Sequence, residues 1–356
     1  MTVRTMTTRA RTRATAAAVL LTLTSGCGAN HSGDAPAVTG ATAEPTAEPT
    51  PEPIESSAGD PDLSSSADTH LPVAVALDLH VGGEQVAGRW YTVAGRGTHW
   101  VGLRDDGTWW WGYDAEPQRI EGEIDQPPAI SADGGHVAYV RTESDHRWML
   151  VGADTEEGGE GLGAVDLPRG AMSPPPRAIA VTADGLVVAG GPDFQWLWRP
   201  LVDGATVDLA ETAPGQVVLG ATDAGLVVNE GTYGRTDATQ GAPYLAVLAD
   251  DGTLTRLGPL PTHDVLVADE EWVAYVPPGT VGGEASGTVE LQVQRRDGSD
   301  AGALTAPEGW QFLVPGFRWE SPGQLLAVLV SSTGETEGLA RCRPDTKTCE
   351  LVDVAG

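Results

Sequence analysis

Lysine is almost absent from this chain: Lys347 is the only one in 356 residues, and arginine supplies the other fixed positive charges. The 21 basic residues are outnumbered by 50 acidic ones, which gives a formal net charge of −29. Binding to nucleic acid requires clustered Lys and Arg, and no such cluster occurs beyond the N-terminus. We therefore expect no nucleic-acid partner, and the acidity indicates a well-solvated surface.

Catalytic motifs and metal-binding spacings are also missing. The sequence contains no Gly-x-Ser-x-Gly elbow, no His-x-x-x-His pair and no Asp-x-Asp-x-Asp-Gly calcium loop. Acidic pairs such as Asp105–Asp106 and Asp250–Asp251 stand beside glycine, where they suit the geometry of tight turns. We expect no metal and no other cofactor. These absences favour a binding role over a catalytic one, and catalysis stays open as the alternative.

The N-terminus has the layout of an export signal. Residues 1–26 carry four arginines and no acidic residue, and the apolar run at 14–24 is too short to cross a bilayer. This run leads into Leu-Thr-Ser-Gly-Cys, which resembles a bacterial lipobox with Thr24 where that motif usually has leucine. The resemblance implies a lipoprotein signal peptide over 1–26 and a lipidated Cys27, anchored at the extracytoplasmic face of the cell membrane. Ordinary cleavage that leaves Cys27 free is the alternative.

The stretch after the signal is dominated by Pro, Thr, Ser, Glu and Ala. Residues 27–70 include a Thr-Ala-Glu-Pro repeat and hold almost no large apolar side chain. Such a composition cannot bury enough apolar surface to offset the entropy lost on ordering. We therefore expect a disordered tether that holds a folded domain, residues 71–356, away from the membrane.

The remainder consists of short β-type runs separated by Asp-Gly, Pro and Gly turns, without a sustained helical period. One unit recurs, in which a turn rich in Asp and Gly precedes an apolar strand. These strands start 36, 50, 40, 46 and 53 residues apart, a spacing typical of four-stranded propeller blades. Strands such as Leu-Val-Val-Ala-Gly are apolar on both faces, as expected of a blade held between neighbours rather than of a sandwich. The recurring strands start at Trp100, His136, Leu186, Leu226, Trp272 and Leu325.

One copy of this unit carries a family resemblance. Residues 131–140, Ser-Ala-Asp-Gly-Gly-His-Val-Ala-Tyr-Val, resemble the repeat of TolB-like propellers, whose usual form is Ser-Pro-Asp-Gly before an apolar strand. The Gly-His and Trp-Asp pairs of WD repeats are absent at the expected places, so the likeness to WD-repeat propellers is one of spacing. We predict an all-β, six-bladed β-propeller. The strand-like segment 73–79 either joins the closing blade or begins a seventh.

Three consecutive tryptophans, Trp109–Trp111, fall in the third strand of the first unit. Tryptophan recurs in the third strands of the next two units, at Trp148, Trp196 and Trp198. Recurrence at one place of a repeated unit predicts packing between blades, with Trp109 and Trp111 on one side of the strand and Trp110 on the other. A platform on which sugars stack is the alternative.

Two cysteines lie in the last expected hairpin. Cys342 and Cys349 are separated by six residues, which allows paired strands to bring their side chains together. Export places the chain in an oxidising compartment, where a disulfide forms and persists. We predict a disulfide that fastens the C-terminal blade. A metal pair is the alternative, although no His or third Cys stands nearby to complete a zinc site.

Loop lengths predict which face of the propeller binds a partner. The loops that join strands two and three of a blade, and one blade to the next, open on one face. On that face the loops in the fourth to sixth units, 230–242, 277–287 and 331–338, are long, and long loops on rigid β scaffolds often carry recognition. Flexible decoration is the alternative. The candidate contact residues are Tyr233, Arg235, Asp237, Gln240, Glu284 and, in a nearby connection, His263.

These features together predict a membrane-tethered monomeric lipoprotein whose propeller binds a protein, peptide or glycan at the cell envelope. The alternative is an envelope glycan hydrolase or lyase whose carboxylates come from different blades and meet at the central channel. A structural or sensory accessory domain of an envelope complex is a third possibility. Convergent Asp, Glu or His in the channel would favour the enzyme, and a patch of exposed loops would favour the binder.

Overall fold

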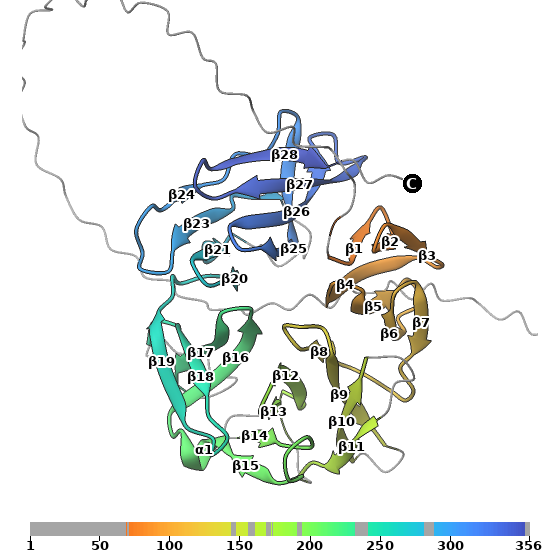
Figure 1. Ribbon diagram of the computed structural model, residues 1–356, viewed down its shortest axis with the longest axis vertical. Helices are drawn as coiled ribbons and strands as arrows, with labels where there is room; N and C mark the ends of the chain where they lie inside the picture. Colours follow the sequence, from red (N-terminus) through yellow and green to blue (C-terminus); the bar gives the residue numbers. More distant parts are fainter. Residues whose placement is uncertain are drawn as a thin grey trace, which may run out of the picture.

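The structure is a computed structural model that describes most of the chain from residue 71 onward. Within the described residues, the strands form seven sheets arranged around a common centre (Figure 1). The chain is therefore an all-β propeller with seven blades, the alternative count, and the six units found in the sequence are the six larger sheets. The predicted signal peptide, Cys27 and nearly all of the tether lie outside the described residues. The described residues are 69, 71–143, 147–155, 161–168, 172, 174–190, 194–231, 241–280 and 288–352.

We number the blades 1 to 7 in chain order. Blade 1 consists of β1 (Val73–Val75), β2 (Asp78–Val81) and β3 (Glu84–Val86). Blade 2 consists of β4 (Trp90–Arg96), β5 (His99–Arg104), β6 (Trp109–Tyr113) and β7 (Glu116–Arg119). Blade 3 consists of β8 (Ala129–Ile130), β9 (His136–Thr142), β10 (Trp148–Asp154) and β11 (Gly161–Asp166). Blade 4 consists of β12 (Arg177–Thr182), β13 (Gly185–Gly190), β14 (Phe194–Trp198) and β15 (Thr206–Asp208).

The last three blades complete the ring. Blade 5 consists of β16 (Gln216–Thr222), β17 (Gly225–Glu230), β18 (Tyr244–Leu248) and β19 (Leu254–Pro259). Blade 6 consists of β20 (Val265–Ala268), β21 (Trp272–Val276), β23 (Gln292–Arg295) and β24 (Gly302–Ala303). Blade 7 consists of β22 (Thr288–Val289), β25 (Trp310–Ser321), β26 (Gln324–Ser331), β27 (Glu337–Arg343) and β28 (Thr348–Val352).

Helix is nearly absent from the described part of the chain. The single described helix, α1 (Leu209–Thr212), is one turn between blades 4 and 5, and the side chain of Asp208 caps it by accepting from the backbone N–H of Ala210. No helix among the described residues has the length and apolarity needed to cross a membrane.

Blade 1 is small because its strands and turns are short. Its strands have three or four residues, whereas β25 has 12 and β26 has eight. Two-residue turns join the strands, and both residues of each turn have positive φ: Ala76 and Leu77 in the first, Gly82 and Gly83 in the second. Turns of this type match the twist of the paired strands. Segment 73–79 therefore begins a seventh blade rather than joining the closing one.

The ring closes where blades 1 and 7 meet, and no strand is exchanged between them. Among the described residues, the sheet of blade 7 contains strands from 288–352 alone. Closure relies on apolar packing and on hydrogen bonds that include two from side chains. The Ala76 backbone N–H donates to Glu337 Oε2 at 2.7 Å, and Arg318 Nη2 donates to the Pro72 carbonyl at 2.6 Å. We call this junction the seam. The buried residues that pack across it are Leu71, Val73, Val75, Leu326 and Leu339.

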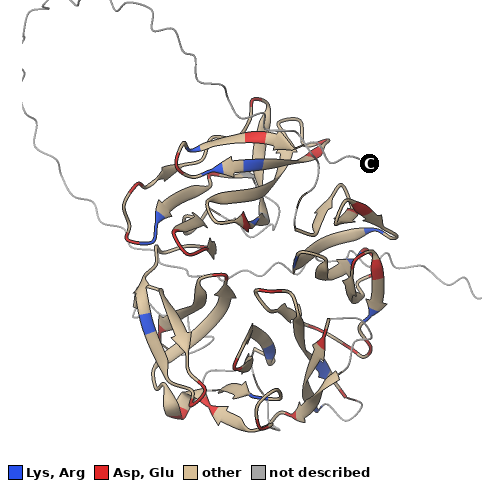
Figure 2. Cartoon of the chain, in the orientation of Figure 1, with Lys and Arg blue, Asp and Glu red and all other residues tan. Residues whose placement is uncertain are grey.

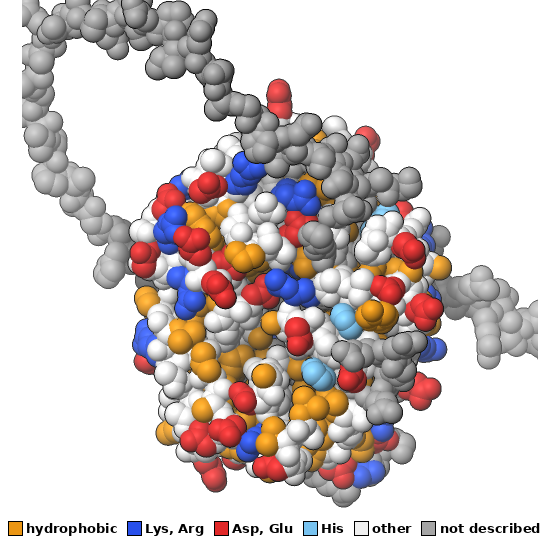
Figure 3. Space-filling view, in the orientation of Figure 1, with side chains coloured by type: hydrophobic (Ala, Val, Ile, Leu, Met, Phe, Trp, Pro, Cys, Tyr) orange, Lys and Arg blue, Asp and Glu red, His pale blue; other side chains and the backbone are white. Residues whose placement is uncertain are grey.

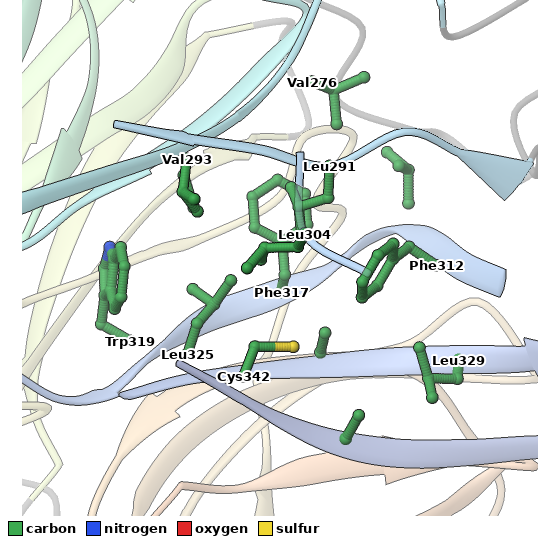
Figure 4. Packing of buried hydrophobic residues seen from close by; sticks show 14 of the residues in the cluster. Val276, Leu291, Val293, Leu304, Phe312, Phe317, Trp319, Leu325, Leu329 and Cys342 are labelled. Atoms are coloured by element: carbon green, nitrogen blue, oxygen red, sulfur yellow. The ribbon is translucent and has the colours of Figure 1, made fainter. Parts of the chain in front are cut away.

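Blades 6 and 7 are joined more tightly than the seam. β22 follows β21 in the chain, yet it pairs with β25 of the next blade through Thr288 with Leu313 and Val289 with Phe312. A large cluster of buried apolar side chains fills the space between these two sheets (Figure 4). The strand and the cluster together bind blade 6 to blade 7.

The tryptophans of β6 pack between blades, as the sequence predicted. Trp109 and Trp111 face the core between blades 2 and 3, and Trp110 faces the core between blades 1 and 2. The core on the Trp110 side holds Trp90 and Trp100, whose rings meet edge to face with centroids 5.0 Å apart. The tryptophans of β10 and β14 occupy the equivalent place between blades 3 and 4. The indoles of β6 therefore contribute to packing, and the structure does not favour a sugar platform there.

The predicted disulfide joins Cys342 to Cys349 in the hairpin of β27 and β28. The two residues are direct partners in the strand register, and their Cα atoms are 4.0 Å apart. Cys342 is fully buried in the cluster between blades 6 and 7. The bond therefore ties the outermost strand of the last blade to the core.

Candidate functional site

A cavity of about 300 Å³ lies at the seam, between blades 1, 2 and 7. In Figure 1 this is the region bordered by β1, β4 and β25. The cavity exists because the short strands of blade 1 do not fill the space between two larger blades. Its walls are mainly apolar and include Val93, Val101, Trp109, Leu313, Leu326 and Leu339. We call it the seam cavity.

The seam cavity opens on the face that carries the connections between blades. Pro127 and Pro128 of its lining belong to the connection from blade 2 to blade 3, and Glu337 stands where β27 begins. Tyr91, next to the start of β4, is 53% exposed at this side. This is the face that the loop lengths predicted for a partner. The cavity lies over blades 1, 2 and 7, of which blade 7 alone belongs to the predicted units four to six.

One cation, Arg318 of β25, lies in the wall of the seam cavity. Its Nη2 donates to the backbone carbonyls of Pro72 at 2.6 Å and Val93 at 3.1 Å, which ties blade 7 to the entering chain and to blade 2. Its Nη1 is buried and has no hydrogen-bond partner among the described residues. Burial lowers the pKa of Arg318 to about 10, against the opposing effect of Asp223, so the guanidinium is charged at neutral pH.

The short turns of the opposite face bring charges together across the ring. Arg96, at the end of β4, pairs with Asp223 in the turn between β16 and β17, with Nη1 and Oδ2 2.6 Å apart. The pair joins blade 2 to blade 5. Burial raises the pKa of the Asp223 carboxyl, and the nearby guanidinium of Arg96 opposes that rise.

A second carboxylate in this region is held by backbone groups. Asp269, in the turn between β20 and β21, accepts from the backbone N–H groups of Glu271 and Trp272 through Oδ1 at 2.8 and 2.6 Å. Its Oδ2 accepts from the backbone N–H of Gly323 in blade 7 at 3.0 Å. The charge of Asp269 contributes to the raised pKa of Asp223, so carboxylates from blades 5 and 6 come near each other, one of the features that the enzyme hypothesis expects. Their partners give both of them a structural role, because one is held in an ion pair and the other fastens turns.

Charged side chains are otherwise dispersed. Figures 2 and 3 show acidic and basic side chains interspersed around the ring, without a large patch of either sign on the face drawn. The part of the chain that the structure describes holds no group of three or more His, Cys, Asp or Glu side chains suited to a metal ion.

Of the predicted contact residues, Tyr233, Arg235, Asp237, Gln240 and Glu284 lie outside the described residues. His263 is described, in the connection between β19 and β20, and it is 6% exposed. Its Nδ1 lies 2.8 Å from the carbonyl oxygen of Pro261, and burial lowers its pKa. A partner would contact this ring only after the connection opened.

Sequence reasoning did not find the seam cavity or Arg318. The available signal was an arginine inside the long, mostly apolar run that became β25. The two carbonyls that hold Arg318 lie more than 200 residues earlier in the chain, at Pro72 and Val93, so no local pattern connects them.

No protein-family model matches this chain, and no curated protein matches it. Solved structures with a similar fold include an oligogalacturonate lyase in complex with manganese, at TM-score 0.45 and 12% identity, covering 74% of this chain and 80% of that one. Another is an oligogalacturonate lyase from Vibrio parahaemolyticus, at TM-score 0.43 and 13% identity, covering 68% and 74%. An acylaminoacyl peptidase from Pyrococcus horikoshii has TM-score 0.46 and 14% identity, covering 72% of this chain and 43% of that one. Likeness at this level concerns the fold and transfers no functional residue.

Proposed function

We propose that this protein is a lipid-anchored extracytoplasmic binding protein of the cell envelope. The basic N-terminus, the short apolar run and Cys27 support the anchor, and the composition of 27–70 supports the tether. The propeller then presents its binding face at a distance from the membrane. The observation that carries the binding role is the seam cavity, a concave and mainly apolar site with few polar groups on a rigid scaffold.

The lining of the seam cavity favours a protein or peptide partner over a glycan. A sugar entering the cavity would bring many hydroxyl groups against apolar walls, and each buried hydroxyl without a partner costs free energy. An apolar side chain or an apolar chain end loses nothing there and gains from leaving water. We therefore place a protein or peptide partner on this face.

The alternative of a glycan hydrolase or lyase has weaker support. Cleavage of a glycosidic bond requires two carboxyl groups on either side of that bond. Among the described residues that line the seam cavity, Glu337 alone has a carboxylate, and it accepts from the Ala76 backbone N–H. The carboxylates of Asp223 and Asp269 are engaged on the other face. No described residue pair favours catalysis.

The anchor is tested by following the full chain and its Cys27→Ala variant in a bacterial host. We expect the unchanged chain in the membrane fraction, with incorporation of a labelled fatty acid, because acyl chains attach it. The variant is expected to lack the label and to leave the membrane fraction after gentle lysis. Equal membrane association of both chains, without label in either, would refute the anchor.

The binding face is tested with a photo-crosslinking amino acid placed at one position at a time in the anchored chain. Tyr91 stands at the rim of the seam cavity. Val202 is a matched control, because it is 57% exposed in the turn between β14 and β15 on the opposite face. We expect crosslinks to an envelope protein from position 91 and none from position 202. Crosslinks confined to position 202 would show that the binding face is misassigned.

A further inference from the structure

Among the described residues, blade 1 has no innermost strand. In blades 2 to 6 the first strand lies nearest the centre of the ring, and the second strand ends on the face that carries the connections between blades (Figure 1). β1 also ends on that face, because the turn after it lies beside the start of β27 and the start of β4. There the Ala76 N–H donates to Glu337, and the Leu77 carbonyl accepts from the Trp90 N–H at 2.8 Å. β1, β2 and β3 therefore correspond to the second, third and fourth strands of the other blades.

The inner edge of β1 presents backbone groups to the seam cavity. Val75 and Asp78 flank a two-residue turn, so their backbones exchange hydrogen bonds. Hydrogen bonding alternates along an antiparallel pair, and the N–H and the carbonyl of the preceding residue, Ala74, therefore point away from β2. Ala74 lines the cavity and is half-buried, so a molecule in the cavity can reach this edge.

Two side chains of blade 7 bind the backbone on either side of Ala74. Pro72 and Ala76 lie two residues from Ala74 and so belong to the same edge. Arg318 Nη2 donates to the Pro72 carbonyl at 2.6 Å, and Glu337 Oε2 accepts from the Ala76 N–H at 2.7 Å. These side chains take the place of a paired strand at the two ends of the edge. Within the described residues, the edge stays open at Ala74.

The seam cavity lies where an innermost strand of blade 1 would run. Its walls come from β1 and from β4 and β25 of the two neighbouring blades. A strand in this position would bury both of its faces between blades, as β12 does in blade 4, where the four central residues are buried. An extended segment with apolar side chains on both faces suits such a place. Strand addition gains affinity from main-chain hydrogen bonds, and a cavity of about 300 Å³ suits a short segment.

The loops at the opening favour an occupant with positive charge. Residues 121–126 and 332–337 border the lining of the seam cavity and hold no basic residue. Arg119 precedes the first loop, and Arg141 beside that loop is paired with Glu143. Negative charge is therefore in excess at the opening, and it attracts a basic residue. The exposed carboxylates of the two loops are Glu121, Glu123, Asp125, Glu335 and Glu337.

We propose that the seam cavity binds an extended segment of a partner protein as the innermost strand of blade 1, antiparallel to β1. The segment enters from the face that carries the connections between blades, so its N-terminal end lies beside the acidic loops. That end carries a basic residue, and apolar side chains follow it into the cavity. The residues of this chain that precede β1 do not have this pattern, because 64–68 read Ser-Ser-Ser-Ala-Asp. The inference rests on the binding role proposed above and states what kind of partner segment this face recognises.

The sequence of β12, Arg-Ala-Ile-Ala-Val-Thr, supplies a peptide with this pattern. Its acetylated amide is titrated by calorimetry into the full chain carrying Cys27→Ala, which avoids detergent. We expect this Arg peptide to bind, and a Glu peptide, with Glu in place of Arg, to bind at least tenfold more weakly. Two further peptides carry N-methyl groups, one at both alanines and the other at the isoleucine and the valine. Only one edge of an added strand pairs with β1, so one of these two peptides should lose binding by tenfold or more and the other should keep it.

Variants place the peptide in the seam cavity. Ala94 is exposed and lines the cavity, so Ala94→Phe fills the space. We expect it to weaken binding of the Arg peptide by tenfold or more while it unfolds at an unchanged temperature. Val202→Phe, on the opposite face, should bind as the parent does. Glu337→Gln keeps an acceptor for the Ala76 N–H and removes the charge, so it should reduce the difference in affinity between the Arg and Glu peptides.

The outcomes separate this inference from the proposed function. The inference is overturned if the Arg peptide does not bind, if the two N-methylated peptides bind equally, or if Ala94→Phe binds as the parent does. It is also overturned if a photo-crosslinker at position 94 captures residues 27–70 of the same chain or a second copy, since the cavity would then have a different occupant. Crosslinks from position 91 to an envelope protein would in each case leave the binding face standing. Crosslinks confined to position 202 would refute that face and, with it, the partner role of the cavity.

Discussion

The clearest test of how tightly the indole of Trp100 packs is one methyl group added at Gly112, its partner on the neighbouring strand of blade 2. A Cβ at this position would lie 2.5 Å from Cζ2 and 2.6 Å from Cε2 of Trp100, and 2.7 Å from the carbonyl oxygen of Glu116. Trp100 has little room to yield, because it is fully buried and its Nε1 donates to the Asp114 carbonyl at 2.8 Å. Overpacking of this kind costs about 1–3 kcal/mol of stability. We expect Gly112→Ala to lower the free energy of unfolding by that amount.

The assay is denaturant unfolding followed by tryptophan fluorescence, with Gly220→Ala as the matched control. A Cβ at Gly220 meets no heavy atom within 4 Å, and Gly220 does not have a positive φ. Replacing a glycine in such a setting stabilises by about 0.4–1 kcal/mol, because the unfolded chain loses freedom. The two variants should therefore move the unfolding midpoint in opposite directions. Equal midpoints would refute the close placement of Trp100 against β6.

Three other measurements probe the remaining features. Reduction of the Cys342–Cys349 bond should lower the free energy of unfolding by about 2.5 kcal/mol, the chain-entropy value for a loop of about eight residues; two free thiols in the unreduced protein would contradict the bond. Burial raises the pKa of Asp223 in the folded protein, so the folded state holds the proton more tightly than the unfolded chain does. The contribution of Asp223 to stability therefore falls as pH rises through its folded pKa. Acidification from about pH 7 to about pH 4 should therefore stabilise the parent relative to Asp223→Asn, and a difference that does not change with pH would count against this. Tryptophan emission should be blue-shifted and resist quenching by acrylamide, since most indoles pack between blades; strong quenching would contradict that packing.

The six larger blades could be predicted from the sequence because each of them repeats the same local pattern of turn and strand. Their second strands are apolar on both faces and follow short turns rich in Asp and Gly. The starting residues predicted for these strands all lie in β5, β9, β13, β17, β21 or β26. The disulfide was readable for a similar reason, since Cys342 and Cys349 are close in the chain and flank one turn.

The seventh blade and the cavity depend on features that local patterns do not carry. The first turn of blade 1 consists of Ala76 and Leu77, both at positive φ. These residue types seldom adopt that conformation, and no turn motif in the sequence predicts it. Arg318 is held by carbonyls from the other end of the chain. His263 lies in a connection that a propeller normally exposes, yet its ring folds inward toward the Pro261 carbonyl. Each of these depends on long-range packing, which becomes visible only when the ring closes.

The seam also determines how the molecule responds to mechanical load. The described propeller begins at Leu71, and that residue packs into the seam beside Leu326 and Leu339. For a chain held at its N-terminus, tension on the tether would reach the propeller at the seam, the junction between the first and last blades. That tension would act on blade 1 and on the walls of the seam cavity before it reached the other blades. Tension on the tether and occupation of the seam cavity would then act on the same few contacts of the seam.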